Sequence, residues 1–484
     1  MTWSDFTLIA PLVAALLVAV AIIVVDMIAP GRSRPAIAVT LVGLAIVAGV
    51  VAWTGQAPGS AFGGSYTVDA LTTYLDLVFV AIVAMTVLFG PEYLGPRDLP
   101  VAEFAAVLVF AMTGAMLIAG SSDLLVLFVA LELMVLPGYL LAGFAKHDAL
   151  STEGAIKYFL LGSFSSAILL FGLAYVWGLT GTTRIDGVAA AITASGGFSP
   201  ALALALALMT TGVAFKLAAV PFHYWTPDAY QGSPTPVTGF LSVGPKVGAI
   251  AIVLRLFVEA LGPVNVDWMP VLAVLAVLTM TLGNLVAVSQ TNVKRMLAYS
   301  SIAHTGYILV GFAVYANDPS TEGLTAVLFY AVAYAFMNLG AFAVVAALQK
   351  RPGVTSQLET FAGLGRREPL LGLLMTLFLL SLTGIPPTAG FFAKALVILA
   401  AVQAEAPLLG LAVVLNAIVA AFYYLRVVVY MYMREPQGEP AAVSHGALLR
   451  VGLAIAAAMT ILIGLLPGPL IDAATNAART LLPG

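Results

Sequence analysis

Cysteine is absent from this chain of 484 residues, and charged residues are scarce. Without cysteine the chain can hold no disulfide framework, no thiolate-bound metal and no iron–sulfur cluster. Aspartate, glutamate, lysine and arginine make up 9% of the residues, whereas soluble proteins carry about 25%. So few charges exclude an ordinary soluble protein and the basic surface of a nucleic-acid-binding protein.

The chain is rich in apolar sequence, since 61% of its residues are hydrophobic. A transmembrane helix needs about 20 apolar residues, and counting such runs predicts about fourteen helices in a lipid bilayer. The expected fold class is all-α, a polytopic membrane protein. The first run, residues 8–28, lacks a preceding basic segment and a small-residue cleavage site, which predicts a retained helix. The connections, at most about twenty residues long, leave no room for a soluble cofactor-binding domain.

The basic residues predict the orientation of these helices. Connections that face the cytoplasm carry an excess of lysine and arginine. If the amino terminus lies outside, the outside segments hold only Arg184 and Arg479. Both termini are therefore predicted on the outer side of a bacterial plasma membrane. The basic residues on the inside connections are Arg32, Arg34, Arg97, Lys146, Lys157, Lys294, Arg295, Lys350, Arg351, Arg366, Arg367, Arg434 and Arg450.

Ionisable side chains inside the predicted spans are the first candidates for function. Glu132 lies halfway along LLVLFVALELMVLPGYLLAGF, Lys216 lies late in span 199–221, and Lys246 lies about ten residues into the next span. A lysine at bilayer depth costs about 2.5–3.5 kcal/mol on insertion scales, so such residues usually have partners and a role. The alternatives are a neutral, hydrogen-bonded Glu132 and a Lys216 that snorkels to the membrane edge.

Prolines follow two of these residues at the same distance. Pro137 comes five residues after Glu132, and Pro221 comes five residues after Lys216. Proline frees the carbonyl four residues earlier, which for Pro221 is that of Leu217. A broken helix at bilayer depth is tolerated where it lines a water-filled cavity or is buried in protein. The seventh helix is therefore predicted to be broken beside Lys216.

The twelfth span, residues 370–402, is interrupted by GIPPTAG, and Lys394 lies about two turns beyond the break. Broken helices at positions seven and twelve are an odd number of spans apart, so they point in opposite directions, as in transporters built from inverted repeats. The predicted divisions are 1–99 for helices one to three, 100–260 for the first five-helix repeat, 261–433 for the second, and 434–484 for the last helix.

Other polar residues lie in or near the spans. His304 lies in MLAYSSIAHTGYILVGF alongside Ser300, Ser301 and Thr305, and could either relay protons near neutral pH or serve as a hydrogen-bonded packing residue. Arg255 and Glu259 are four residues apart, which predicts a local ion pair. No metal-ligand cluster, phosphate-binding loop or nucleophile arrangement is found in the sequence.

The turn FHYWTPDAYQGSPTPV separates the seventh and eighth predicted helices. Its aromatic residues Tyr224, Trp225 and Tyr230 predict an interfacial anchor, because tyrosine and tryptophan gather at the membrane surface. A role for His223 in proton intake is the alternative.

Five stretches of the chain resemble the antiporter-like proton-pumping subunits of NADH-quinone oxidoreductase, respiratory complex I. They are FVALELMVLPGYLLAGF, STEGAIKYFLLGSFSSAILLFGLAYVWGLTGTT, FKLAAVPFHYWTPDAYQGSPTPVTGFLSVGPKVGA, NVKRMLAYSSIAHTGY and GIPPTAGFFAK. The second stretch is most similar to subunit N, and the others are shared among relatives. Lys394 also agrees with subunits N and L, since subunit M has a glutamate in the matching motif.

The resemblance implies roles for the buried ionisable residues. Glu132 and Lys216 would form a charge pair, Lys246 would be the central proton relay, and Lys394 would pass protons toward the outlet, with His304 as an intermediate. It also implies no cofactor in this chain, with NADH, FMN, iron–sulfur clusters and quinone in other subunits, and with subunits K and M as neighbours. The alternatives are a subunit of a multisubunit sodium/proton antiporter and a structural membrane-arm subunit.

Overall fold

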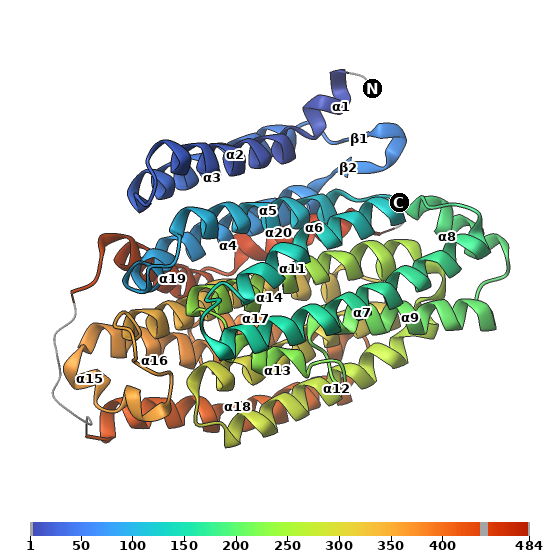
Figure 1. Cartoon of the computed structure of the whole chain (residues 1–484). Coiled ribbons are helices and arrows are strands. Elements are labelled where there is room, and N and C mark those ends of the chain that lie inside the picture. The colour runs from blue at the N-terminus through green and yellow to red at the C-terminus, as the bar shows by residue number, and fades with distance from the viewer. Residues whose placement is uncertain (1–2, 436–443, 483–484) are drawn as a thin grey trace.

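The computed structural model describes residues 3–435 and 444–482. Its long helices lie side by side in one bundle, and both chain ends lie toward the same end of it, on the right in Figure 1. We call this end the terminal face and the other end the opposite face. Residues 436–443, part of the predicted 434–484 division, and residues 1–2 and 483–484 lie outside the described residues.

The prediction of an all-α polytopic membrane protein is confirmed. Within the described residues, 13 helices are long and apolar enough to cross a membrane. They are α2 (Ala10–Ile28), α3 (Ser33–Thr54), α4 (Ala70–Leu94), α5 (Val101–Gly120), α6 (Leu124–Ala142), α7 (Ala149–Thr180), α9 (Pro200–Leu217), α11 (Thr235–Val253), α12 (Asn265–Ser289), α13 (Val293–Asn317), α14 (Thr321–Leu348), α18 (Pro407–Met433) and α19 (Ala447–Leu465).

The predicted twelfth span is a pair of short helices, α16 (Pro369–Thr383) and α17 (Ala389–Gln403). Gly384 ends α16 in the left-handed conformation, with φ of 92°, which a side chain would disfavour. Each helix has 15 residues and is about 22 Å long, less than the hydrocarbon thickness of about 30 Å. The predicted break is confirmed, and only the two helices together reach across the membrane.

The seventh predicted helix ends four residues earlier than expected. Helix α9 stops at Leu217 instead of residue 221, and Ala218 adopts a left-handed conformation with φ of 58°. After an irregular segment, the short helix α10 (Trp225–Gly232) precedes α11. The break therefore comes directly after Lys216, because the chain leaves the helix before it reaches Pro221.

Short elements cover the two ends of the bundle (Figure 1). Strands β1 (Gly59–Ala61) and β2 (Tyr66–Val68) form an antiparallel hairpin that pairs Gly59 with Val68. The remaining short helices are α1 (Trp3–Leu8), α8 (Ile185–Ala194), α15 (Leu364–Arg367), α20 (Gly468–Arg479), the 3-10 turns η1 (Phe62–Gly64), η2 (Gly95–Arg97), η4 (Gly262–Val264) and η5 (Leu358–Phe361), and the π-helical segment η3 (Leu254–Ala260) that continues α11.

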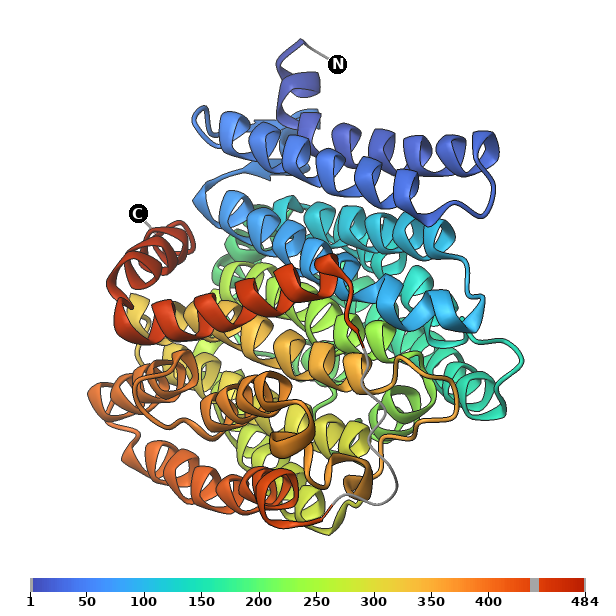
Figure 2. The ribbon, with the colours of Figure 1, turned by 90° about the vertical axis from the view of Figure 1, so that its left-hand side faces the viewer.

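The centre of the bundle is made by α11, α13 and α14. In the most apolar window of these helices 100%, 94% and 89% of the residues are buried, against 28% in α2. The hairpin of α2 and α3 lies at one edge in both views, whereas α19 lies against α4, α14 and α17 (Figures 1 and 2). Lys246 and His304 are therefore carried by the most enclosed helices.

Candidate functional site

Lys216 is held between three helices near the end of α9. Its Nζ atom donates to Ser166 Oγ at 2.9 Å and reaches the Gly162 carbonyl oxygen and the Tyr139 hydroxyl at 3.4 Å each. Only 4% of the residue is exposed. The partners lie on α6 and α7, so the amine is directed into the bundle and does not snorkel to the membrane edge.

Glu132 lies on α6, two helical turns before Tyr139. Among the residues that the structure describes, no direct ion pair joins Glu132 to Lys216, so the pair implied by the resemblance is not in contact here. The Oε1 atom of Glu132 is buried and has no hydrogen-bond partner in the described chain. Gly114 on α5 permits a close approach of α6, because a Cβ atom there would lie 2.4 Å from the Met134 backbone nitrogen. Helix α5 thus packs closely against α6 beside Glu132.

The break after Lys216 is supported by side chains of other helices. The Leu217 carbonyl oxygen, which proline was predicted to leave free, accepts a 2.7 Å hydrogen bond from Thr305 Oγ1. The Val220 amide donates to Thr279 Oγ1 at 2.9 Å. Backbone groups at a helix break inside a membrane must find such partners. Helices α12 and α13 therefore stabilise the break.

Lys246 lies on α11 and is 3% exposed. Its Nζ atom donates to Thr305 Oγ1 at 2.9 Å and to the Ser301 carbonyl oxygen. The Thr305 hydroxyl consequently contacts both Lys246 and the end of α9. This threonine links Lys246 to the backbone beside Lys216, and its part could not be assigned from the sequence, where it was one of several hydroxyls near His304.

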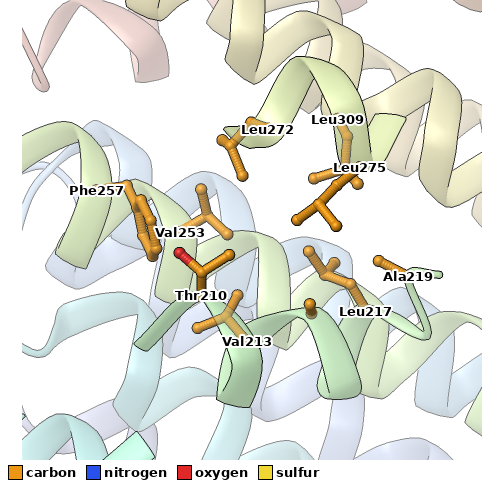
Figure 3. A pocket seen from close by; sticks show the side chains of 10 residues that line it. Thr210, Val213, Leu217, Ala219, Val253, Phe257, Leu272, Leu275 and Leu309 are labelled. Atoms are coloured by element: carbon orange, nitrogen blue, oxygen red, sulfur yellow. The ribbon is translucent and has the colours of Figure 1, made fainter. Parts of the chain in front are cut away.

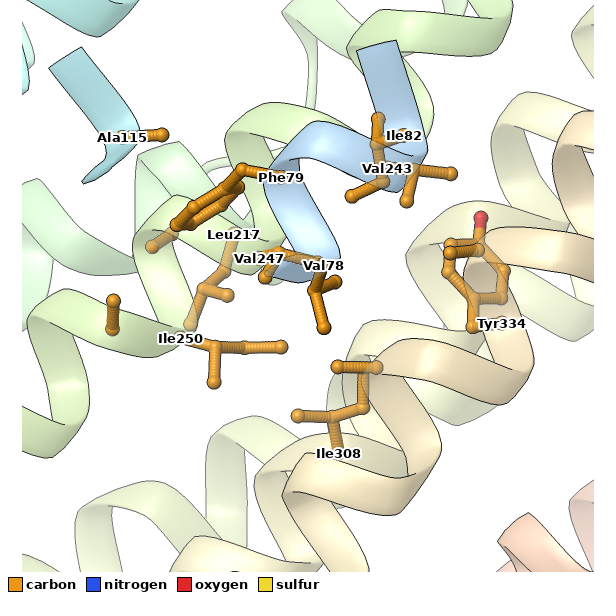
Figure 4. Close-up of a cluster of buried hydrophobic side chains, with 14 of the residues drawn as sticks. Val78, Phe79, Ile82, Ala115, Leu217, Val243, Val247, Ile250, Ile308 and Tyr334 are labelled. Carbon is orange, nitrogen blue, oxygen red and sulfur yellow. The ribbon is translucent and has the colours of Figure 1, made fainter. Parts of the chain in front are cut away.

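On its other side, α11 packs against apolar residues (Figure 4). Three α11 side chains flank Lys246 in sequence and are buried among residues of α4 and neighbouring helices. This cluster includes Val243, Val247 and Ile250 from α11, Val78, Phe79 and Ile82 from α4, Ile308 from α13 and Tyr334 from α14. The polar contacts of Lys246 therefore all come from α13.

His304 is 1% exposed and both its ring nitrogens have partners. Nδ1 is 2.7 Å from the Tyr330 hydroxyl, and Nε2 is 3.3 Å from the Tyr424 hydroxyl, which also contacts Ser300. The ring centroid of Tyr334 lies 4.9 Å from that of His304. These contacts suit both alternatives, a relay group and a packing residue.

Lys394 connects the two short helices of the twelfth span. Its Nζ atom donates to the carbonyl oxygens of Thr383 at 2.7 Å and Leu382 at 3.0 Å, at the end of α16. The last carbonyls of a helix lack helical partners and carry partial negative charge, which favours a cation. The amine also lies 4.9 Å from the centroid of Tyr307, whose ring is 5.6 Å from His304.

The sequence-predicted residues thus fall into a row of short steps and one outlier. Lys246 is bonded to Thr305, His304 directly precedes Thr305 on α13, and the Tyr307 ring packs against both His304 and Lys394. Lys216 joins the row through the backbone at Leu217. Glu132 lies beyond Lys216 without touching it.

The prediction of an interfacial aromatic anchor at the turn after α9 is wrong. Trp225 is 2% and Tyr230 0% exposed, and Trp225 stacks on Tyr158 with centroids 4.1 Å apart. Only Tyr224 is on the surface, at 71% exposure. Helix α10 packs against α7 and α13, so Trp225 and Tyr230 contact protein and not the lipid surface. Aromatic composition alone does not distinguish these two placements.

Charged residues fasten α10 to its neighbours. Asp228 accepts hydrogen bonds of 2.7 Å from both Lys157 on α7 and Arg295 on α13. Burial opposes ionisation of the carboxyl, but the two bonds outweigh it and hold the pKa of Asp228 below its usual value. Near the same turn, partial burial lowers the pKa of His223.

The predicted Arg255–Glu259 ion pair is confirmed, with a distance of 2.7 Å. Arg255 is 2% exposed and also pairs with Asp69 at 3.0 Å. This second partner is 186 residues away in the sequence, so spacing along one helix could not reveal it.

An apolar pocket lies beside α9 and the break that follows it (Figure 3). Its volume is about 10 Å³, enough for roughly one water molecule. Thr210 supplies the only hydroxyl in its lining. The lining therefore offers a water molecule almost no hydrogen-bond partners. Across residues 3–435 and 444–482, no group of three or more histidine, aspartate or glutamate side chains could hold a metal ion.

Comparison with known proteins identifies the family. The model of the NADH:quinone oxidoreductase/Mrp antiporter membrane family matches residues 121–420. NADH-quinone oxidoreductase subunit N of Trichlorobacter lovleyi is 40% identical, with 98% of this chain and 97% of that protein covered. The same subunit of Chloroflexus aggregans is 42% identical, with 96% and 95% covered.

Solved structures of related chains have the same fold. A chain of respiratory complex I from Thermus thermophilus is 32% identical, has a TM-score of 0.79, and covers 96% of this chain and 98% of its own length. A chain of the Mrp complex from Dietzia has a TM-score of 0.86 at 23% identity, with 99% and 98% covered, which shows a shared fold. The chain described here belongs to the family of NADH-quinone oxidoreductase subunit N.

Proposed function

We propose that this chain is a proton-translocating membrane-arm subunit of NADH-quinone oxidoreductase, a subunit without redox chemistry of its own. One observation supports the proposal: Lys246 bonds Thr305, the neighbour of His304 on α13, and Tyr307 packs against both the His304 ring and the Lys394 amine. Amines, imidazole and hydroxyl groups can each accept and release a proton. Intramembrane ionisable residues mark proton relays more often than structural pairs.

The separation of Glu132 and Lys216 supplies the control step in this proposal. A carboxylate close to a lysine favours the charged amine, and its withdrawal favours release of the proton. Quinone reduction elsewhere in the complex would change this separation, and the proton of Lys216 would move to Lys246. Moving one charge against 100 mV costs about 2.3 kcal/mol, which a rearranged charge pair can supply.

The opposite face is the inner side in this proposal, because it carries most lysine and arginine residues in the connections. Protons would enter beside α10. Four buried polar atoms without partners in the described chain support this route, since such groups are normally bonded to protein or water. They are His223 Nδ1, Thr226 Oγ1, Ser301 Oγ and Tyr334 OH.

The two repeats, residues 100–260 and 261–433, remain part of the proposal. Each would contain one broken helix, α9 or the α16–α17 pair, with a lysine beside the break. In this arrangement subunits K and M are the neighbours, and NADH, FMN, iron–sulfur clusters and quinone belong to other subunits of the complex.

The test is proton pumping by the assembled complex in proteoliposomes. Lys246→Ala should lower the ratio of protons pumped to electrons transferred while leaving NADH oxidation and assembly in place. Lys146→Ala, on the exposed connection before α7, is the matched control. A normal proton-to-electron ratio in the Lys246 variant would contradict the relay and favour a structural role. Sodium-dependent proton flux without NADH-linked activity would instead select a sodium/proton antiporter.

A further inference from the structure

Two carboxylates contact one histidine at the opposite face of the bundle, and none of these three residues belongs to the row of lysines. His445 lies just before α19, and its Nδ1 atom is 3.2 Å from Glu92 Oε1, near the end of α4. Its Nε2 atom is 2.9 Å from Glu368 Oε2, directly before α16. The side chains of His445, Glu92 and Glu368 are 14%, 10% and 26% exposed. The three groups are therefore largely shielded from water.

These two contacts require one more proton than the ordinary neutral side chain provides. An ionised carboxylate can only accept hydrogen bonds, and a neutral imidazole carries a single N–H. With both carboxylates ionised, a neutral His445 would face one of them with a lone pair. Both contacts are hydrogen bonds only when the ring is doubly protonated or one carboxyl carries the proton.

With that extra proton the charges at the site balance. The charged groups that face the site are Glu92 from α4, Glu368 from the start of α16 and Lys350 from the end of α14, with Lys350 Nζ 2.9 Å from Glu92 Oε1. Two carboxylates and one ammonium leave one negative charge. A protonated imidazole brings the sum to zero.

We propose that Glu92, His445 and Glu368 form a proton-binding site that fastens the start of α19 to α4 and α16. Backbone contacts of the same segment belong to this attachment. The Gly446 amide donates to Glu92 Oε2 at 3.1 Å, and Lys350 Nζ donates to the Ser444 carbonyl oxygen. Loss of the proton leaves His445 able to hold only one of the two carboxylates, so the attachment weakens.

The other end of α19 shows which elements this attachment affects. A Cβ atom at Gly464, in the last turn of α19, would lie 2.2 Å from the Pro387 carbonyl oxygen, so the helix packs directly on the break between α16 and α17. Helix α19 also contacts α4 and α14 along its length (Figure 2). One proton at the opposite face thus helps to position a helix that covers the break beside Lys394.

Hydrogen–deuterium exchange of the intact complex tests the site, because the Gly446 amide reports the attachment directly. After correction for intrinsic exchange, its protection in the wild type should fall with rising pH between the midpoint of the detached site and the higher midpoint of the attached site. The fall should be at most about tenfold per pH unit, as expected for opening linked to loss of one proton, and protection should level off at higher pH. The Arg295 amide, capped by Asn292 at 3.1 Å on the same face, is the control and should not respond.

Two variants make the test specific. Glu368→Gln should keep Gly446 protected at high pH, because a neutral imidazole can donate to Glu92 and accept from the glutamine amide. His445→Ala should lower protection at every pH and remove its pH dependence. Unchanged protection of wild-type Gly446 between pH 5.5 and pH 9, or the same pH dependence in His445→Ala, would overturn the proposal. These measurements need no proton pumping, so they stand or fall independently of the proposed function.

Discussion

The Thr305 hydroxyl donates a 2.7 Å hydrogen bond to the Leu217 carbonyl oxygen, at the point where α9 ends beside Lys216. The same hydroxyl accepts from Lys246 Nζ at 2.9 Å. One side chain of α13 therefore stabilises the broken helix and contacts the central lysine. This position makes Thr305 a direct probe of how Lys246 is coupled to the broken end of α9.

Thr305→Val should impair both features at once. It leaves the buried Leu217 carbonyl without its donor, which costs about 1–3 kcal/mol, and it removes a partner of Lys246. We expect a lower thermal midpoint and a lower proton-to-electron ratio of the complex in proteoliposomes. Thr305→Ser keeps the hydroxyl and should pump normally. Equal pumping by Thr305→Val and the wild type would show that the hydroxyl has no part in transfer.

Lys394→Met should stop proton transfer without preventing assembly. The variant removes the amine that caps α16 at Leu382 and Thr383, while keeping a flexible chain of similar length. We expect NADH oxidation with a reduced proton-to-electron ratio, measured with a pH-sensitive dye in proteoliposomes. Arg450→Met on the exposed side of α19 is the control. Retention of the full ratio in Lys394→Met would remove this residue from the route.

Ionisation of the Asp228 carboxyl should make the stability of the folded chain depend on pH. Its pKa is lower in the folded chain than the ordinary value of about 3.9, so its bonds to Lys157 and Arg295 contribute stability at neutral pH. That contribution is lost as the pH falls below the ordinary value through the lowered pKa. Asp228→Asn should therefore lower the free energy of unfolding at pH 7 by about 1 kcal/mol, since the carboxyl is partly exposed. The thermal midpoint should fall accordingly.

The difference between Asp228→Asn and the wild type should shrink when the same thermal melts are recorded in acid. Glu153→Gln, at the other carboxylate that contacts Lys157, is the matched control, because its side chain is 57% exposed. A constant difference between the Asp228 variant and the wild type at every pH would show that ionisation of the carboxyl is not the cause.

Gly114→Val should separate α5 from α6 beside Glu132. Its first side-chain atom would lie 2.4 Å from the Met134 backbone nitrogen, and such overpacking costs about 1–3 kcal/mol. A methyl group at Gly49, on α3, would meet no atom within 4 Å, so Gly49→Ala should leave the thermal midpoint unchanged or raise it. An unchanged thermal midpoint in Gly114→Val would mean that α5 can move away from α6 without loss of stability.

The sequence was enough to predict the broken helices and the burial of three lysines. Proline and glycine in GIPPTAG interrupt the helix whatever the surrounding helices are, because their effects on the backbone are local. A lysine inside an apolar run must also find partners whichever helix supplies them. These predictions depend on neighbouring residues along the chain, and the structure agrees with them at Leu217 and Gly384.

Contacts between distant segments could not be predicted in this way. Thr305 is 88 residues from Leu217, and His445 is 353 residues from Glu92. Trp225 and Tyr230 were misplaced for the same reason, since the burial of α10 depends on how α7 and α13 pack around it. The separation of Glu132 from Lys216 is likewise a property of helix positions and has no signature in either residue's own stretch.

The apolar cluster on the α4 side of Lys246 has an electrical consequence. The α4 and α11 side chains of this cluster (Figure 4) are hydrocarbon and offer no dipoles to stabilise a cation, whereas the hydrogen bonds of Lys246 run to α13. We therefore expect a proton on this amine to leave toward α13, because the α4 and α11 side chains can neither accept nor donate one.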